Sequence, residues 1–268
     1  MADKGTSKKV TRVSGDSSSD GARSFTPTAE AKGSAIKFRI IAVVLWAVAI
    51  GLEIFAIYLL KKPPIVMWQI IALIVADLAF AVAGILLWKK ANRFDPASEK
   101  EPVKFFFQNQ LGVIIAFIAF LPLVILIFTN KDLQGKQKGI LGGIAVAALL
   151  IAGITGVDFN PPSQEQYAEQ TAEVEKLTGK NLVYWTKSGK SYHLYSSCSY
   201  INTSRTNELF EGTVADARKL KNITDLCDRC ANQAAKEKGL DLTKAVDAVK
   251  DKALEVKETA GKELDNTK

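Results

Sequence analysis

Four long apolar segments constrain the fold of this chain more than any other feature of its sequence. They cover residues 40–60, 65–88, 111–128 and 139–157. The first, of about 21 residues, would form about 31 Å of α-helix, which matches the hydrocarbon core of a bilayer. Helices buried in soluble proteins rarely stay apolar on every face over such lengths. We therefore expect four transmembrane helices and exclude a single soluble globule.

The positive charge of the chain lies beside these apolar segments. The chain has 268 residues and a formal net charge of +7. Residues 1–157 hold 18 Lys and Arg against 10 Asp and Glu, whereas residues 158–268 hold 17 against 18. The excess of Lys and Arg therefore bears on how the chain is oriented in the membrane, and it is no evidence for a nucleic-acid-binding domain.

The Lys and Arg residues that flank the apolar segments predict the orientation in the membrane. Eight of them precede residue 40, and five lie between the second and third segments. The other two connecting loops hold five together. Because cytoplasmic flanks carry the excess of Lys and Arg, we expect both ends of the chain in the cytoplasm, with the N-terminal tail deciding the orientation. The expected location is the plasma membrane, or the inner membrane of a bacterium.

Two acidic residues, Glu53 and Asp77, lie inside apolar segments. Carboxylates within a membrane are energetically costly and are therefore candidates for a functional site. One hypothesis is a small transporter or ion-conducting protein that uses both acids. The alternative is a protonated pair, or hydrogen bonds between neighbouring helices. We favour this alternative, because no Lys, Arg or His accompanies the acids within the apolar segments and four spans are few for a transporter.

The two ends of the chain differ from the segments between them. Residues 1–37 are rich in Ser, Gly, Thr, Lys and Asp and hold almost no large apolar side chains, so we expect a disordered tail. In residues 239–268, apolar side chains recur every three or four positions among Lys, Asp and Glu, which predicts an amphipathic helix. Such a helix would oligomerise weakly, rest on the membrane surface or remain solvated.

The only histidine and all three cysteines of the chain fall in one stretch: His193, Cys198, Cys227 and Cys230. Two ligand pairs at short spacing, joined by a longer connector, are what a tetrahedral metal site requires. Thiolate and imidazole ligands suit zinc. A redox pair of Cys227 and Cys230 would leave the other two residues unexplained, and haem attachment would require His where Ala231 stands. A chance cluster of buried cysteines remains the alternative to a metal site.

The local pattern around these four residues predicts a small α+β domain. Residues 182–186 and 191–195 are predicted to form the two strands of a hairpin, and His193 lies in the second strand. Thr213 is placed to cap a helix over residues 214–220, and Cys227 precedes the start of another helix. Before this domain, residues 163–177 are expected to form a linking helix.

The stretch from Val183 to Cys230 resembles the small metal-binding domain of the bacterial Ada-type DNA-repair methyltransferases. The shared pattern consists of an aromatic strand, a glycine turn, two spaced ligands, a polar loop, a short helix and a Cys-x-Arg-Cys motif. In this chain the matching residues are Tyr184, Trp185, Gly189, His193, Cys198, Asn202 to Arg205, Ala215 to Ala217, and Cys227 to Cys230. The resemblance covers about 48 residues and implies a zinc site and a related fold.

The chain departs from that family at the residue that matters for its reaction. In the family all four ligands are cysteines, and the first accepts the methyl group. His193 takes this place here, and the first ligand pair has one more intervening residue. Zinc-bound imidazole lacks the thiolate nucleophile, so we do not expect methyl transfer. DNA binding is also not expected, because residues 182–232 hold only seven Lys and Arg against five Asp and Glu.

These observations predict a mainly α protein with a four-helix transmembrane bundle, a small α+β zinc-binding domain and a C-terminal amphipathic helix. The expected parts are residues 1–37, 38–158, 159–181, 182–238 and 239–268. Four protein ligands leave no open position on the metal, so the zinc is expected to be structural and the protein non-enzymatic. It would act as a membrane anchor or bind a cytoplasmic protein partner, and an oligomer is compatible with the sequence. A metal-thiolate sensor or alkyl acceptor is a further alternative.

Overall fold

The computed structural model describes residues 9–13 and 25–239, and it divides the chain into two compact units. One unit is Ser18–Ala168. The other combines Met1–Ser17 with Glu169–Lys268. The predicted amphipathic helix of residues 239–268 falls almost entirely outside the described residues.

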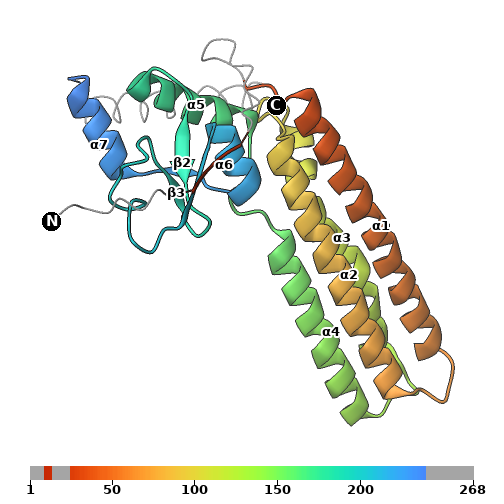
Figure 1. The fold of residues 1–268 in the computed structure, drawn as a ribbon. Helices are drawn as coiled ribbons and strands as arrows, with labels where there is room; N and C mark the ends of the chain where they lie inside the picture. Colours follow the sequence, from red (N-terminus) through yellow and green to blue (C-terminus); the bar gives the residue numbers. More distant parts are fainter. Residues whose placement is uncertain (1–8, 14–24, 240–268) are drawn as a thin grey trace. The chain divides into compact units, whose positions relative to one another are not determined.

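The first unit is a bundle of four long helices (Figure 1). They are α1 (Ala29–Leu60), α2 (Met67–Phe94), α3 (Pro102–Thr129) and α4 (Gly135–Gly156). Each is long and apolar enough to cross a membrane, as the sequence predicted. Each helix also extends beyond its apolar segment on at least one side, so the apolar pattern alone underestimates helix length.

Small residues let the helices of the bundle approach closely. A Cβ atom added to Gly156 of α4 would lie 2.6 Å from the backbone nitrogen of Val113 in α3, so only glycine fits this contact. Gly142 lies under the ring of Phe128. The pair Gly139 and Gly143, which the spacing marks as a packing motif, is exposed and has open space around both residues. The packed face of α4 therefore contains Gly142 and not the motif of Gly139 and Gly143.

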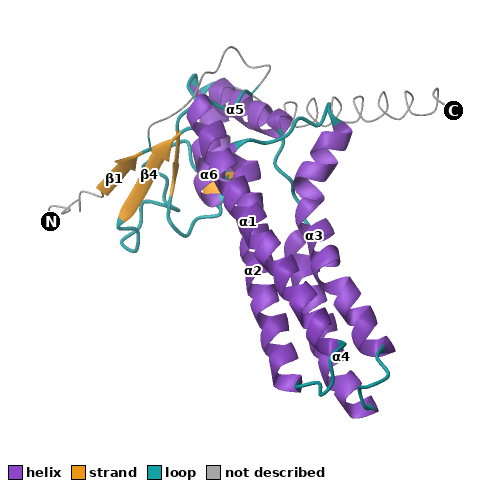
Figure 2. Ribbon diagram, turned by 90° about the vertical axis from the view of Figure 1, so that its right-hand side faces the viewer, coloured by secondary structure: helices purple, strands orange, loops and turns teal. Residues whose placement is uncertain are grey.

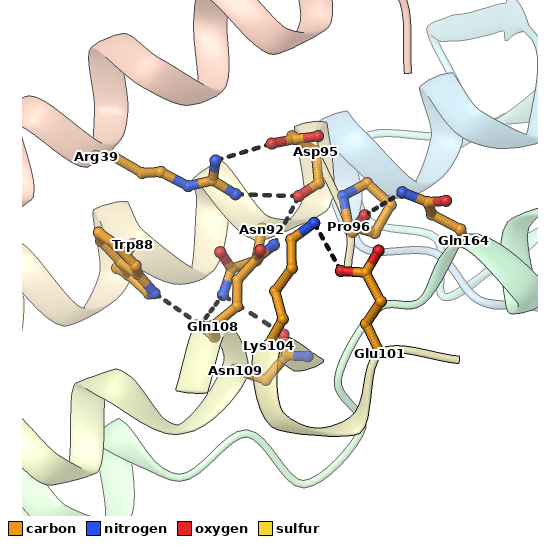
Figure 3. A network of polar contacts seen from close by, with 10 residues as sticks. All are labelled: Arg39, Trp88, Asn92, Asp95, Pro96, Glu101, Lys104, Gln108, Asn109 and Gln164. Carbon is orange, nitrogen blue, oxygen red and sulfur yellow. Dashed lines mark hydrogen bonds and ion pairs between the residues drawn. The ribbon is translucent and has the colours of Figure 1, made fainter. Parts of the chain in front are cut away.

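A polar network joins α1, α2 and α3 near one end of the bundle (Figure 3). The guanidinium of Arg39 donates to the carboxylate of Asp95 at 2.8 Å and to its backbone carbonyl at 3.1 Å. Gln108 donates to the same carbonyl at 2.8 Å. The backbone carbonyl of Gln108 in turn accepts from the side chains of Trp88 and Asn92, both at 2.7 Å. These hydrogen bonds hold α1, α2 and α3 together at this end of the bundle.

The described residues of the second unit form two small sheets and three helices. The helices are α5 (Gln164–Thr178), which begins in the first unit, α6 (Val214–Lys221) and α7 (Asp228–Glu237). One sheet has β4 (Glu208–Gly212) at its centre, parallel to β1 (Lys9–Arg12) and antiparallel to β2 (Val183–Trp185) (Figure 2). The other sheet pairs β3 (Ser191–Tyr192) with β5 (Asp225–Leu226) in parallel.

The interpretation of residues 1–37 as a disordered tail is wrong for two of its segments. Residues 9–12 form β1, because their backbone pairs with β4. Two side-chain hydrogen bonds add to this pairing: Thr11 donates to Glu208 and Arg12 donates to Glu211, both at 2.8 Å. Residues 29–37 are the first turns of α1. The hydroxyl of Thr28 accepts from the Ala31 N–H at 3.3 Å and caps this helix.

The predicted hairpin is present but shorter than expected. Tyr184 and His193 exchange two backbone hydrogen bonds of 2.8 and 2.7 Å, which places the two segments side by side. The second segment is a strand only at Ser191 and Tyr192, since it turns toward β5 rather than continuing beside β2. The predicted cap is present: Thr213 and Asp216 form a capping box at the start of α6.

Candidate metal centre

The structure brings His193, Cys198, Cys227 and Cys230 together. One ligand atom from each lies within 4.8 Å of all the others. The Nδ1 atom of His193 is 3.7 Å from the Sγ atom of Cys230. A tetrahedral zinc ion, with bonds of about 2.0 to 2.3 Å, separates its ligand atoms by about 3.5 to 3.8 Å. The distance between His193 and Cys230 lies in this range, and the other ligand atoms are close enough for the cluster to hold one ion.

The backbone around each ligand explains how this arrangement forms. His193 is held against Tyr184 by the paired backbone hydrogen bonds of the hairpin. The Cys227 N–H donates to the Tyr192 carbonyl at 2.9 Å, and this bond ties the second ligand pair to the first. Cys227 then occupies the N-cap of α7, and Cys230 follows in the first turn of that helix.

Cys198 lies in a turn rather than in a helix or strand. Its N–H donates to the Tyr195 carbonyl at 3.1 Å, and its own carbonyl accepts from the Asn202 N–H at 2.7 Å. These bonds close the chain around the sulfur and direct it inward. The first ligand pair thus combines a residue next to strand β3 with a residue in a turn.

All four ligands are buried. Their exposed fractions are 5% for His193, 8% for Cys198, 6% for Cys227 and 1% for Cys230. The three cysteines belong to a compact apolar core that includes Trp185 of β2. A bound ion would therefore be enclosed by protein, which is the form of a structural rather than a catalytic site.

Burial also sets the protonation of two ligands. It raises the pKa of the Cys230 thiol to about 12, against the influence of backbone N–H groups of Leu194 and Tyr195. Burial lowers the pKa of His193, so the ring is neutral near pH 7. A neutral imidazole can coordinate a cation directly. A divalent cation would favour the thiolate forms of the cysteines.

A polar cavity of about 770 Å³ borders the cluster. His193 and Cys227 contribute to its wall, together with Glu173 of α5, Lys190 before β3 and Arg229 of α7. The sequence does not indicate this cavity, because its wall combines parts of the chain that carry no common motif. It provides an opening in which a small polar ligand or a partner side chain could contact residues next to the cluster.

The second pair of candidate residues lies in the helix bundle. Glu53 and Asp77 are 4% and 1% exposed. The Oε1 atom of Glu53 accepts a hydrogen bond from the Leu123 N–H at 3.3 Å. Neither carboxylate oxygen of Asp77 has a hydrogen-bond partner among the described residues.

Comparison with protein-family models, with curated proteins and with solved structures finds no match to this chain. The cluster geometry and the four apolar helices therefore carry the functional argument.

Proposed function

We propose that this chain is a multi-pass membrane protein that carries a structural zinc domain and acts without catalysis, as an anchor or a partner-binding protein. The observation behind this proposal is the convergence of His193 with the three cysteines, all buried, within 4.8 Å. Zinc fits because it accepts mixed imidazole and thiolate ligands in a tetrahedral arrangement. The bilayer would be the partner of α1 to α4.

The closure of the cluster supports a non-enzymatic role. Four protein ligands complete a tetrahedral zinc site, so no position remains for water or substrate. The only histidine of the chain is one of these ligands, so no imidazole is left to serve as a general base.

An alkyl acceptor fits the cluster less well. Such a reaction needs a thiolate that an electrophile can reach. The three cysteines are at most 8% exposed, and His193 stands where the Ada-type domain has its reactive cysteine. We therefore assign the cysteines to metal binding alone.

The Lys and Arg distribution supports a cytoplasmic position for this domain, and the same argument supports a cytoplasmic protein partner. The cavity beside the cluster is the place where we expect such a partner to insert a polar side chain, since Lys190 and Arg229 offer positive charge and Glu173 offers negative charge there.

Metal content tests the proposal directly. The full-length chain is purified in detergent after expression with zinc available, and the ratio of metal to protein is measured. We expect one zinc ion per chain, and we expect its loss in Cys227→Ser and His193→Ala. Ser197→Ala is the matched control, because this exposed hydroxyl lies next to Cys198 without belonging to the cluster. A folded C-terminal unit that contains no metal would refute the proposal.

A further inference from the structure

Glu53 and Asp77 lie buried at matching levels of the neighbouring helices α1 and α2. The indole of Trp46 in α1 packs on Gly84 in α2. The two helices run antiparallel (Figure 1), so this contact aligns them at that level. Glu53 follows Trp46 by seven residues, and Asp77 precedes Gly84 by seven. Since seven residues are about two helical turns, the same faces meet again at the two acids.

The two carboxyl groups have different surroundings. Pro122 of α3 has no N–H, so the helix misses one backbone hydrogen bond at this level. The next N–H, that of Leu123, donates to Glu53. This donor favours a negative charge on Glu53. Asp77 has no comparable donor among the described residues, so no described group stabilises a negative charge there.

No basic side chain of the bundle interior compensates a charge on Asp77. Helices α1, α3 and α4 pack against α2. Residues 105–128 of α3 and 139–157 of α4 contain no Asp, Glu, Lys, Arg or His. The apolar segment of α1 contributes Glu53 and the phenol of Tyr58, which is 55% exposed. Glu53 is therefore the only acidic or basic side chain that α1, α3 and α4 present to Asp77 within their apolar segments.

Asp77 also lies at the middle of its apolar segment. Eleven or twelve residues separate it from each end of residues 65–88, which corresponds to about 17 Å of helix on either side. An ionised carboxylate at this depth, without a donor or a cation, is strongly unfavourable. A proton on the carboxyl group removes that charge and supplies a hydroxyl donor.

We propose that Asp77 and Glu53 form a proton-binding site in the membrane interior, with the proton resident on Asp77 at neutral pH. Glu53, which accepts a hydrogen bond from the Leu123 N–H, is the neighbouring acid that carries the negative charge. The ligand of the site is a proton from solution, because α1 to α4 provide no cationic side chain at this depth. Uptake and release of the proton change the charge between α1 and α2, which is the property that a proton-coupled membrane protein needs.

Infrared spectroscopy of the full-length chain in lipid nanodiscs tests this site. At neutral pH we expect the C=O band of a protonated carboxylic acid, shifted when the Asp carboxyl groups carry ¹³C. Asp77→Asn removes this band. Glu101→Gln leaves it unchanged, because Glu101 is an exposed carboxylate that pairs with Lys104 outside the apolar segments. Should Asp77→Asn fail to fold, the isotope shift in the unaltered protein still decides the question.

Titration separates a site that exchanges its proton from a fixed structural acid. Raising the pH from about 5 to about 10 spans the range in which buried carboxyl groups ionise, and the band should disappear reversibly over this range. A band that persists at the highest pH would overturn the proposal, as would the absence of any such band at neutral pH. Loss of the band on adding Na⁺ at constant pH would assign the site to a metal cation instead and also overturn it.

Discussion

The indole of Trp46 packs directly on the backbone of Gly84, where a Cβ atom would lie 2.5 Å from the Nε1 atom. Trp46 is 4% exposed, so it has little room to move away. The substitution Gly84→Ala should therefore overpack the interface of α1 and α2. We expect the free energy of unfolding to fall by about 1–3 kcal/mol, measured by unfolding of the detergent-solubilised chain.

Gly139→Ala is the matched control for Gly84→Ala. Gly139 also lies in a membrane helix, but nothing stands within 4 Å of a Cβ atom added there. Alanine is the better helix former by about 1 kcal/mol, so this variant should be neutral or slightly more stable. Equal destabilisation by both substitutions would contradict the close contact at Gly84.

Removal of the metal should unfold one part of the chain and spare the other. A structural metal contributes folding free energy directly, and the three cysteines of the cluster belong to the same core as Trp185. After treatment with a strong zinc chelator, we expect residues 182–238 to lose protection from hydrogen exchange while α1 to α4 keep theirs. Addition of zinc should restore the protection. Unchanged exchange in residues 182–238 after complete metal removal would show that the domain folds without its ion.

The membrane helices could be predicted because their signal is local and cumulative. Hydrophobicity over about 20 residues identifies a span whatever surrounds it. The limits of the helices depend on caps and on polar contacts instead. Thr28 starts α1 well before the apolar segment, among polar and small residues that the composition alone placed in a disordered tail.

The strand β1 could not be predicted for a different reason. Its residues Lys9 to Arg12 include three polar side chains, and the strand exists because β4, about 200 residues away, offers backbone partners and two glutamates. The packing face of α4 was likewise ambiguous. Gly142 and Gly143 are adjacent glycines that no sequence pattern distinguishes. The ring of Phe128 packs against Gly142, whereas Gly143 has open space around it.

The convergence of His193 with the three cysteines was predictable, because these residue types are rare in this chain and their spacing is specific. The cavity beside them was not, because Glu173, Lys190 and Arg229 share no spacing that indicates a common wall. The alignment of Glu53 with Asp77 required the contact of Trp46 with Gly84, which no pattern in either helix reveals.

Tyr192 should be replaceable by phenylalanine without loss of stability. Its hydroxyl is buried and has no hydrogen-bond partner among the described residues, and burial raises the pKa of this phenol well above its usual range. Removing an unsatisfied buried hydroxyl relieves a desolvation cost, so we expect Tyr192→Phe to be neutral or more stable by up to about 1 kcal/mol. Hydrogen exchange of the surrounding amides measures the change.

Tyr167→Phe provides the opposite case. The Tyr167 hydroxyl is bonded to the Arg93 carbonyl at 2.7 Å, and its loss should cost about 0.5–1.5 kcal/mol. The two variants delete the same atom from buried tyrosines, one without a partner and one with a partner. Destabilisation by Tyr192→Phe as large as that by Tyr167→Phe would reveal a hidden partner of Tyr192.

The carboxylate of Glu165 should make the start of α5 sensitive to acid. Burial acts to raise its pKa, but hydrogen bonds from the Ser98 hydroxyl at 2.5 Å and the Glu99 N–H at 2.9 Å outweigh this effect and lower it. A lowered pKa in the folded state means that the ionised carboxylate stabilises the fold at neutral pH. This contribution is lost as the pH falls through the folded-state pKa.

Glu165→Gln measures that contribution. At neutral pH we expect the variant to be less stable than the unaltered chain, by at most about 1 kcal/mol because solvent screens this partly exposed group. The difference in melting temperature between the two should shrink as the solution is acidified, since the unaltered carboxylate then becomes neutral as well. A difference that stays constant from neutral to acid pH would assign the effect of the substitution to packing, and the charge of Glu165 would then have no part in anchoring α5 to the loop at Ser98.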